Sequence, residues 1–128
     1  MSLIFPNSVR INRGAYVFKD IIHISIKREF TDLIILHEHR GEPDGMIICH
    51  FPLGPTLYLS LKNVVLRHDL KEKPDNMSEE YPHLIFNGFS TKIGERVIKI
   101  IKHLFPIPKM EAKRVISFSN FDNFVSFR

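Results

Sequence analysis

The sequence has no tryptophan, a single cysteine and only six glycines among its 128 residues. One cysteine, Cys49, cannot form an internal disulfide, and this usage is typical of a reducing compartment. No apolar run reaches the roughly 18 residues that a membrane-spanning helix needs. The first residues also lack the basic segment and apolar run of a secretory signal. We therefore expect neither a disulfide-stabilised protein nor a membrane-spanning one.

What is present is the composition of a globular protein. Hydrophobic residues make up 44% of the chain and charged residues 25%, a balance too mixed to indicate disorder. The length fits one domain over residues 1–128. The formal net charge of +4 favours anionic partners such as nucleic acid. A basic surface without a special partner explains the same charge equally well.

Hydrophobic periodicity predicts helices and strands in alternation. Apolar residues at helical spacing predict helices over residues 14–30 and 92–104, and the second has the clearest apolar stripe. Ser90 or Thr91 is placed to cap that second helix. Alternating or short apolar runs predict strands at residues 9–12, 33–39, 46–51, 56–66, 83–86, 114–119 and 124–127. The expected fold class is α/β or α+β with a mixed sheet.

A possible zinc site lies in the first predicted hairpin. Turn chemistry at residues 41–45 predicts a five-residue loop, which places His37 opposite Cys49 and His39 opposite Ile47. The two histidines and the cysteine would then share one face of the hairpin. The spacing matches no standard zinc finger, and a sheet histidine satisfied by hydrogen bonds is the commoner outcome. We predict no metal.

A nucleophile-and-base pair is the alternative chemistry for the same hairpin. It would use Cys49 together with His37 or His50. No glycine-rich oxyanion turn frames the cysteine, and a buried, inert thiol is the usual state. We therefore predict no catalytic residue, no cofactor and no enzymatic activity.

Basic residues are the stronger candidates for function. They fall at strand ends, in loops and on the outer face of the second helix, where they are able to neutralise RNA phosphates. A solvated helix face is the competing interpretation. Phe121, expected in a loop, is the best exposed candidate for stacking on a base. The predicted RNA-binding residues are Arg10, Arg13, Arg40, Lys62, Arg67, His68, Lys92, Arg96, Lys99 and Lys102.

Six separated blocks of the sequence resemble the Brix-domain family, most closely its branch in U3 small nucleolar ribonucleoproteins. The resemblance runs in the same order over almost the whole chain. The blocks are HEHRGEPDG (37–45), the Gly54-Pro55-Thr56 step, NVVLRHD (63–69), MSEEYPHLIF (77–86), KHLFPIPK (102–109) and RVISFSNFDNFVSFR (114–128).

The resemblance implies a fold of two similar α/β halves, each like the anticodon-binding domain of class II synthetases. It implies a non-enzymatic ribosome-assembly factor of the nucleus and nucleolus that binds U3 snoRNA or pre-rRNA and supports pre-18S rRNA processing in the small-subunit processome. The implied partners are Mpp-ten-type and S4-like processome proteins, with no membrane. An alternative is a protein-docking module of the same complex, with RNA bound elsewhere.

The chain also departs from the family pattern. From the resemblance we expect it to lack the first strand and helix of the Brix fold and to stop before the last strands. We therefore expect residues 1–128 to form a single, truncated Brix domain. Missing strands would leave sheet edges unpaired, which favours self-association.

Overall fold

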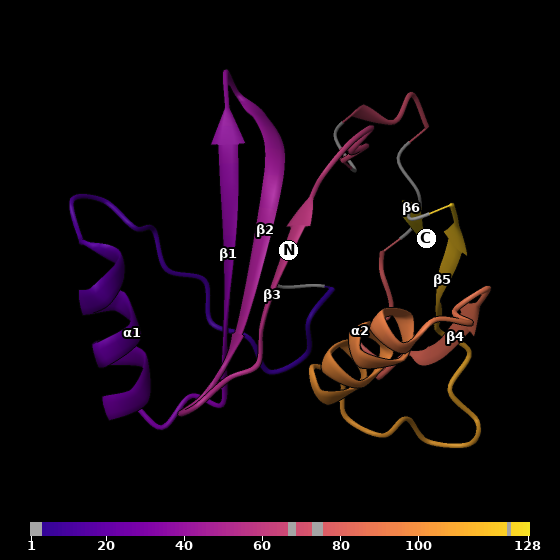
Figure 1. Cartoon of the computed structure of the whole chain (residues 1–128). Coiled ribbons are helices and arrows are strands. Elements are labelled where there is room, and N and C mark those ends of the chain that lie inside the picture. Colours follow the sequence, from indigo (N-terminus) through magenta and orange to yellow (C-terminus); the bar gives the residue numbers. More distant parts are fainter. Residues whose placement is uncertain (1–3, 67–68, 73–75, 123) are drawn as a thin grey trace. The chain divides into compact units, whose positions relative to one another are not determined.

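The structure, a computed structural model, describes residues 4–66, 69–72, 76–122 and 124–128 (Figure 1). The chain divides into two compact units, one of residues Ile11–Asp75 and one of Met1–Arg10 with Asn76–Arg128. We call them the hairpin unit and the helix–sheet unit. Each contains one helix and one three-stranded sheet, so the predicted α+β class with helices and a mixed sheet is confirmed. None of the helices in the described part of the chain is long and apolar enough to cross a membrane.

The hairpin unit has helix α1 (Phe18–Lys27) followed by three antiparallel strands in the order β1-β2-β3. The strands are β1 (Asp32–His39), β2 (Glu42–His50) and β3 (Thr56–Ser60). The central strand β2 carries the most buried residues, with Ile48 only 1% exposed and Cys49 6% exposed. A central strand is paired on both edges, which explains why its side chains are the most enclosed of the sheet.

The turn between β1 and β2 differs from the sequence prediction. It is a two-residue turn at Arg40 and Gly41, whose φ angles of 51° and 83° are both positive. Positive φ at both central residues matches the twist of a hairpin, so the strands continue up to the turn. Pro43 lies inside β2. There the register shifts, because Asp44 is an extra residue of β2 opposite the step from His37 to Glu38 in β1. The predicted five-residue loop over residues 41–45 is therefore wrong.

The bounds of other predicted elements also differ from those in the structure. The predicted helix over residues 14–30 is shorter, because Val17 is extended just before it and Glu29 has a positive φ angle of 60° just after it. Residues 9–12 form no strand, and β3 ends at Ser60 rather than continuing to residue 66. After β3 the backbone N–H of Leu61 still donates a hydrogen bond of 2.8 Å to the carbonyl of Asp44 in β2, but the regular strand pairing has ended at Ser60.

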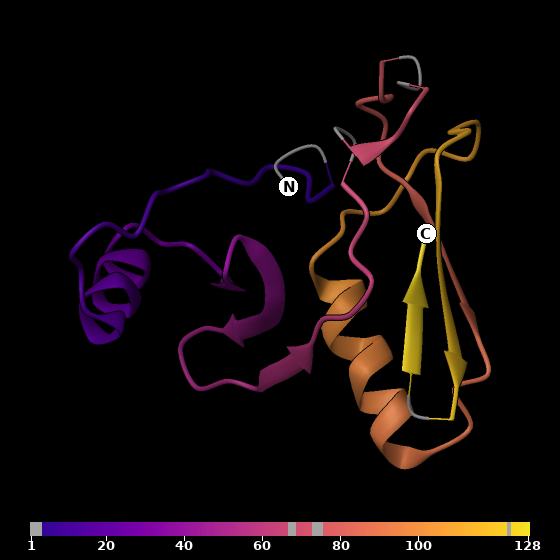
Figure 2. The same cartoon turned by 90° about the horizontal axis from the view of Figure 1, so that it is seen from above.

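The helix–sheet unit contains β4 (His83–Asn87), α2 (Lys92–His103), β5 (Val115–Phe121) and β6 (Phe124–Phe127). The strand order is β4-β5-β6, with β4 parallel and β6 antiparallel to β5. Parallel neighbours need a long crossover, and α2 supplies it. Figure 2 shows α2 lying along one face of this sheet.

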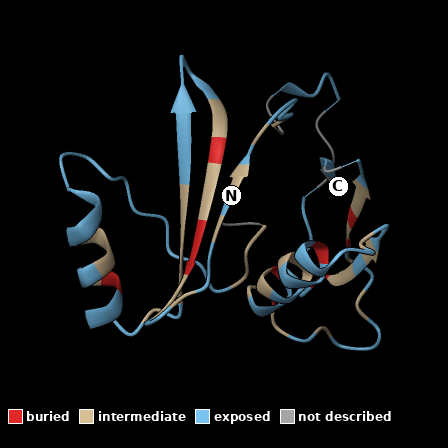
Figure 3. Ribbon diagram, viewed as in Figure 1, coloured by how far each residue is buried: buried red, intermediate tan, exposed pale blue. Residues whose placement is uncertain are grey.

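The core of this unit lies between α2 and the sheet. Its buried members are Ile101, Phe105, Ile116 and Phe118, and Figure 3 shows the buried positions on α2 and β5. The rings of Phe86 and Phe118 stack with centroids 5.0 Å apart. Because side chains alternate across a strand, this packing assigns one face of the sheet to the core and leaves the other face outside.

Gly88 joins β4 to the loop before α2, and no other residue type fits there without strain. Its φ is +76°, and a Cβ at this position would lie 2.5 Å from the carbonyl oxygen of Asn120. The side-chain amide of Asn120 also donates a hydrogen bond of 3.1 Å to the Gly88 carbonyl. The close approach ties the end of β4 to β5 and so fixes where the chain turns into α2.

Candidate nucleic-acid interface

Helix α2 begins at a well-formed cap. The side-chain oxygen of Thr91 accepts a hydrogen bond of 3.0 Å from the backbone N–H of Gly94. Gly94 is buried against Phe89 and Thr91, and a Cβ there would lie within 3.2–3.3 Å of both. Ser90 or Thr91 was predicted as the cap, and the structure selects Thr91. The cap and the close contact fix which face of α2 turns toward the sheet.

The opposite side of α2 is basic. Lys92, Arg96 and Lys99 follow one another at helical spacing on the side away from buried Ile101, and all three side chains are exposed. Among the residues that the structure describes, no carboxylate makes an ion pair with any of the three. We call these residues the α2 basic face. Three cations without internal partners are available to bind an anionic ligand.

Lys102 lies at the border of this face. Its ammonium group sits 5.6 Å from the centroid of the Phe86 ring, which belongs to the core-facing side of β4. A cation over an aromatic ring at an exposed site gains about 0.5–1 kcal/mol. Lys102 therefore both adds positive charge beside the basic face and covers the edge of the core.

The other predicted RNA-binding residues lie outside α2. Arg10 is exposed in the N-terminal segment of the helix–sheet unit. Three more belong to the hairpin unit: Arg13 donates to the Tyr16 carbonyl over 3.1 Å, Arg40 lies in the β1–β2 turn, and Lys62 follows β3. The remaining two, Arg67 and His68, lie outside the described residues.

The histidines of the first hairpin do not form the zinc set. His37 pairs in register with Gly45, whereas Cys49 pairs with Leu33 at the other end of the hairpin. The predicted alignment was wrong because it rested on the five-residue turn. Within residues 4–66, 69–72, 76–122 and 124–128, no group of three or more potential ligands is placed to hold a metal ion.

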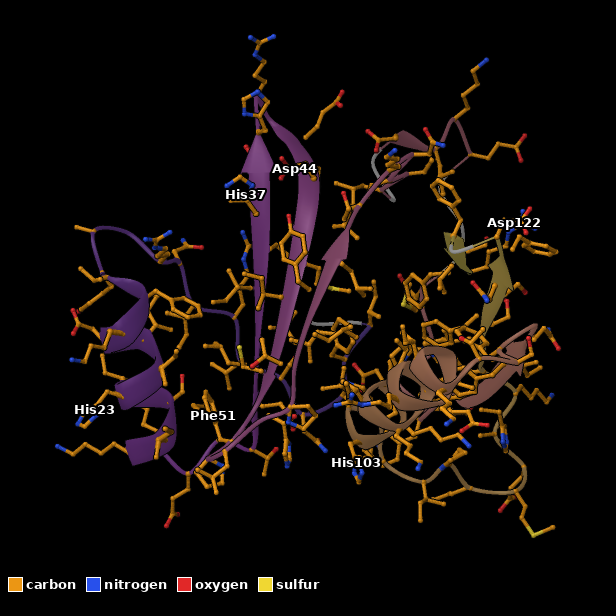
Figure 4. The ribbon with its side chains drawn as sticks, viewed as in Figure 1. His23, His37, Asp44, Phe51, His103 and Asp122 are labelled. Carbon is orange, nitrogen blue, oxygen red and sulfur yellow. The ribbon has the colours of Figure 1, made fainter. Side chains whose placement is uncertain are left out.

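His37 has a different partner. Its Nδ1 lies 2.6 Å from Oδ1 of Asp44, the residue that the bulge in β2 turns toward it (Figure 4). The hydrogen bond from His37, reinforced by the charge of the ring, lowers the pKa of Asp44 below its ordinary value. The contact is a cross-strand link near the tip of the hairpin.

The nucleophile-and-base pair is also separated. His50 Nδ1 lies 2.9 Å from Oδ1 of Asp32, its register partner on β1. Cys49 is the preceding residue of the same strand, so its side chain points to the opposite face of the sheet. The geometry gives Cys49 no base among its strand neighbours on that face, which are Leu33 and Thr56.

Phe121 is 70% exposed, as the sequence suggested, but it ends strand β5 instead of lying in a loop. Its register partner is Phe124, which is 64% exposed and which the sequence analysis missed. Alternation along residues 114–128 contains the signal. The strand predicted over residues 114–119 ended before Phe121, however, so the sequence analysis did not pair it with Phe124.

Comparison with known proteins identifies the family. The family model described as the Brix domain matches residues 1–128. The chain belongs to the Brix family. A Brix domain-containing protein of Caenorhabditis elegans is 53% identical over 128 residues, which are 100% of this chain and 44% of that protein. The predicted resemblance is confirmed.

Several other relatives in this family carry a functional name. The U3 small nucleolar ribonucleoprotein protein IMP4 of Saccharomyces cerevisiae is 50% identical over 129 residues, and the human protein of that name is 47% identical over 130 residues. Each match covers 100% of this chain and 44% of the relative. This Brix chain therefore spans less than half the length of the curated relatives that it matches.

A solved structure supports the fold. The crystal structure of a probable ribosomal biogenesis protein from Aeropyrum pernix K1 superposes with a TM-score of 0.62, covering 99% of this chain and 76% of that one. The sequences are only 19% identical, so this likeness shows a shared fold and no more.

Proposed function

We propose that this Brix chain is the RNA-binding part of a ribosome-assembly factor that acts in a U3 small nucleolar ribonucleoprotein. The observation that carries the proposal is the α2 basic face, three exposed cations on one helix that form no ion pair among the described residues. The names of its relatives, U3 small nucleolar ribonucleoprotein protein IMP4, support the choice of U3 snoRNA and pre-rRNA as ligands. The proposed activity is to bind and position RNA, without catalysis.

In this proposal Lys92, Arg96 and Lys99 contact phosphates, with Lys102 beside them, while base pairing between U3 and pre-rRNA supplies sequence specificity. The other predicted RNA-binding residues, which lie in both units, add further contacts to RNA phosphates. The proposed site of action is the nucleolus, in the small-subunit processome with Mpp-ten-type and S4-like proteins, where the complex supports pre-18S rRNA processing.

The salt dependence of binding tests this proposal. Each phosphate contact on single-stranded RNA contributes about −0.7 to the slope of log affinity against log salt. Three contacts give a slope of about −2.1, which weakens binding about 20-fold between 50 and 200 mM salt. Replacing Arg96 and Lys99 by glutamine keeps a good helix former at both positions and reduces the magnitude of the slope by about 1.4.

The experiment is a fluorescence-anisotropy titration of a labelled U3 snoRNA or pre-rRNA fragment across a salt series. Lys19→Gln is the matched control, because Lys19 is an exposed lysine on α1, outside every predicted contact. We expect the control to bind as the unaltered chain does. Absence of binding at low salt, in a sample shown to be folded by circular dichroism, refutes the proposal. So does an unchanged slope in the double variant.

A second candidate function is a protein-docking module of the same complex. Exposed apolar side chains follow α2, with Ile107 92% and Met110 99% exposed. A contiguous exposed apolar patch marks an interaction surface, and these two residues are the candidates for one in the segment after α2. Under this alternative, Ile107→Ser with Met110→Ser abolishes binding to a purified Mpp-ten-type or S4-like partner. The Arg96→Gln/Lys99→Gln variant would leave that binding unchanged.

A further inference from the structure

The sheet of the helix–sheet unit has one face that α2 does not cover. The register pairs Ile85 with Ser117 and Phe121 with Phe124, and these residues point away from the core formed by Ile116 and Phe118. We call this side the outer face. Its members along the three strands are His83, Ile85, Asn87, Val115, Ser117, Ser119, Phe121, Phe124, Ser126 and Arg128.

Two aromatic rings mark one end of the outer face. Phe121 and Phe124 are direct cross-strand partners, beside the turn that contains Asp122, labelled in Figure 4. Side chains at such paired positions have Cβ atoms about 4.5–5.5 Å apart, so both aromatic residues stand at the same end of the outer face. They are 70% and 64% exposed. We call them the aromatic pair.

The positions next to the aromatic pair are small and polar. Ser119 pairs with Ser126 directly beside it, and Ser117 follows one step further along β5. All three are only partly exposed, as short side chains on a pleated surface are. Hydroxyl groups therefore lie at one side of two aromatic residues that are mostly exposed.

This chemistry fits an unpaired nucleobase better than a protein. A base offers a flat apolar face for stacking and a polar edge for hydrogen bonds, and aromatic residues on open sheets hold single-stranded RNA in this way. The centre of a protein interface is a continuous apolar patch, whereas here serines separate the aromatic pair from Ile85 and Val115. Among the described outer-face positions no side chain is a carboxylate, and Arg128 adds positive charge.

We propose that the aromatic pair stacks on one or two unpaired bases of a single-stranded RNA, with the hydroxyl groups of Ser119 and Ser126 facing the base edges. This inference rests on the proposed RNA-binding function and adds a second subsite to it. The aromatic pair lies on the opposite side of the sheet from α2, so its effect on binding is separable from the phosphate contacts. Stacking contributes affinity that salt does not remove, whereas the α2 basic face contributes the salt-dependent part.

The test uses the 128-residue chain and a single-stranded RNA of about ten nucleotides that carries the fluorescent base 2-aminopurine. The main variant is Phe121→Leu with Phe124→Leu, which removes both rings and keeps the positions apolar. Base–aromatic stacking is worth about 1–3 kcal/mol per base, so we expect binding to weaken about 5- to 150-fold. The salt slope should stay the same, and the fluorescence change that reports stacking should disappear. Phe121→Tyr should bind as the unaltered chain does.

Val115→Thr is the matched control. Val115 is 50% exposed on the same face, and threonine keeps its shape while reducing its apolar character. We expect it to leave RNA affinity unchanged. An equal loss of affinity in this variant overturns the proposal, because it assigns binding to the apolar surface in general rather than to ring stacking.

The remaining outcomes separate the two proposals. If the leucine variant binds RNA as tightly as the unaltered chain, with the same fluorescence change, the aromatic pair does not bind bases, and RNA binding through α2 still stands. If the unaltered chain fails to bind this RNA at low salt, both proposals are refuted. Circular dichroism and amide exchange of β5 confirm that each variant is folded.

Discussion

Gly88 provides a strict test of how this fold is held together. A left-handed φ such as its +76° costs a residue with a Cβ about 1–2 kcal/mol. In addition, the new Cβ would lie 2.5 Å from the Asn120 carbonyl oxygen, so the β4 and β5 backbones must shift apart. Overpacking of this kind typically costs about 1–3 kcal/mol. We expect Gly88→Ala to destabilise the helix–sheet unit by about 2–5 kcal/mol in total.

Gly41 supplies the matched control, because its φ of +83° carries the same conformational cost while nothing lies within 4 Å of its Cβ position. Gly41→Ala should therefore lose only about 1–2 kcal/mol, confined to the hairpin unit. Native-state amide exchange measures both effects, since amides of β4 and β5 report on one unit and those of β1 and β2 on the other. Equal losses in the two variants would refute the argument that the contact with Asn120 selects glycine at residue 88.

Two further predictions follow from single hydrogen bonds. Thr91→Ala removes the cap of α2 and should lower the free energy of unfolding, measured in urea, by about 0.5–2 kcal/mol. Thr91→Ser keeps the hydroxyl group and should retain most of the stability. Equal stability of the two variants would show that the hydroxyl group does not cap the helix. The pKa of Asp44 is lowered from its ordinary value of 3.8, so its ionised form stabilises the folded chain at every pH above 3.8. This contribution to stability is lost as the pH falls through the lowered pKa. Carbon-13 NMR titration of His37→Phe should show the pKa of Asp44 rising toward its ordinary value, and an unchanged pKa would exclude His37 as the cause.

The sequence predicted α2 almost to the residue, over 92–104 against the observed Lys92–His103. Its apolar stripe, its basic face and its cap all lie within one segment of the chain. Helical periodicity is a local property, because residues three and four apart share a face whatever the rest of the chain does. The basic face was readable for the same reason.

The first hairpin shows where local reasoning ends. Glycine, proline and aspartate at residues 41–45 indicated a long turn, but β2 already starts at Glu42, and a bulge absorbs the irregularity. Register depends on the φ angles at the turn and on contacts between two strands, which a single segment does not encode. The observed register pairs Cys49 with Leu33 instead of His37, so the cysteine lies at the other end of the hairpin from the histidines and the three residues do not come together.

The sequence itself thus determined three features, through motifs and short-range periodicity. They are membership of the Brix family, the α+β class and the amphipathic helix α2. Tertiary structure alone decided that Lys102 covers Phe86, that Gly88 approaches Asn120, and that Phe121 is the register partner of Phe124 on the sheet face that α2 does not cover. These three pairings join residues that are 16, 32 and 3 positions apart, across strands whose register no single segment encodes. The proposed base-stacking site exists only because of that pairing.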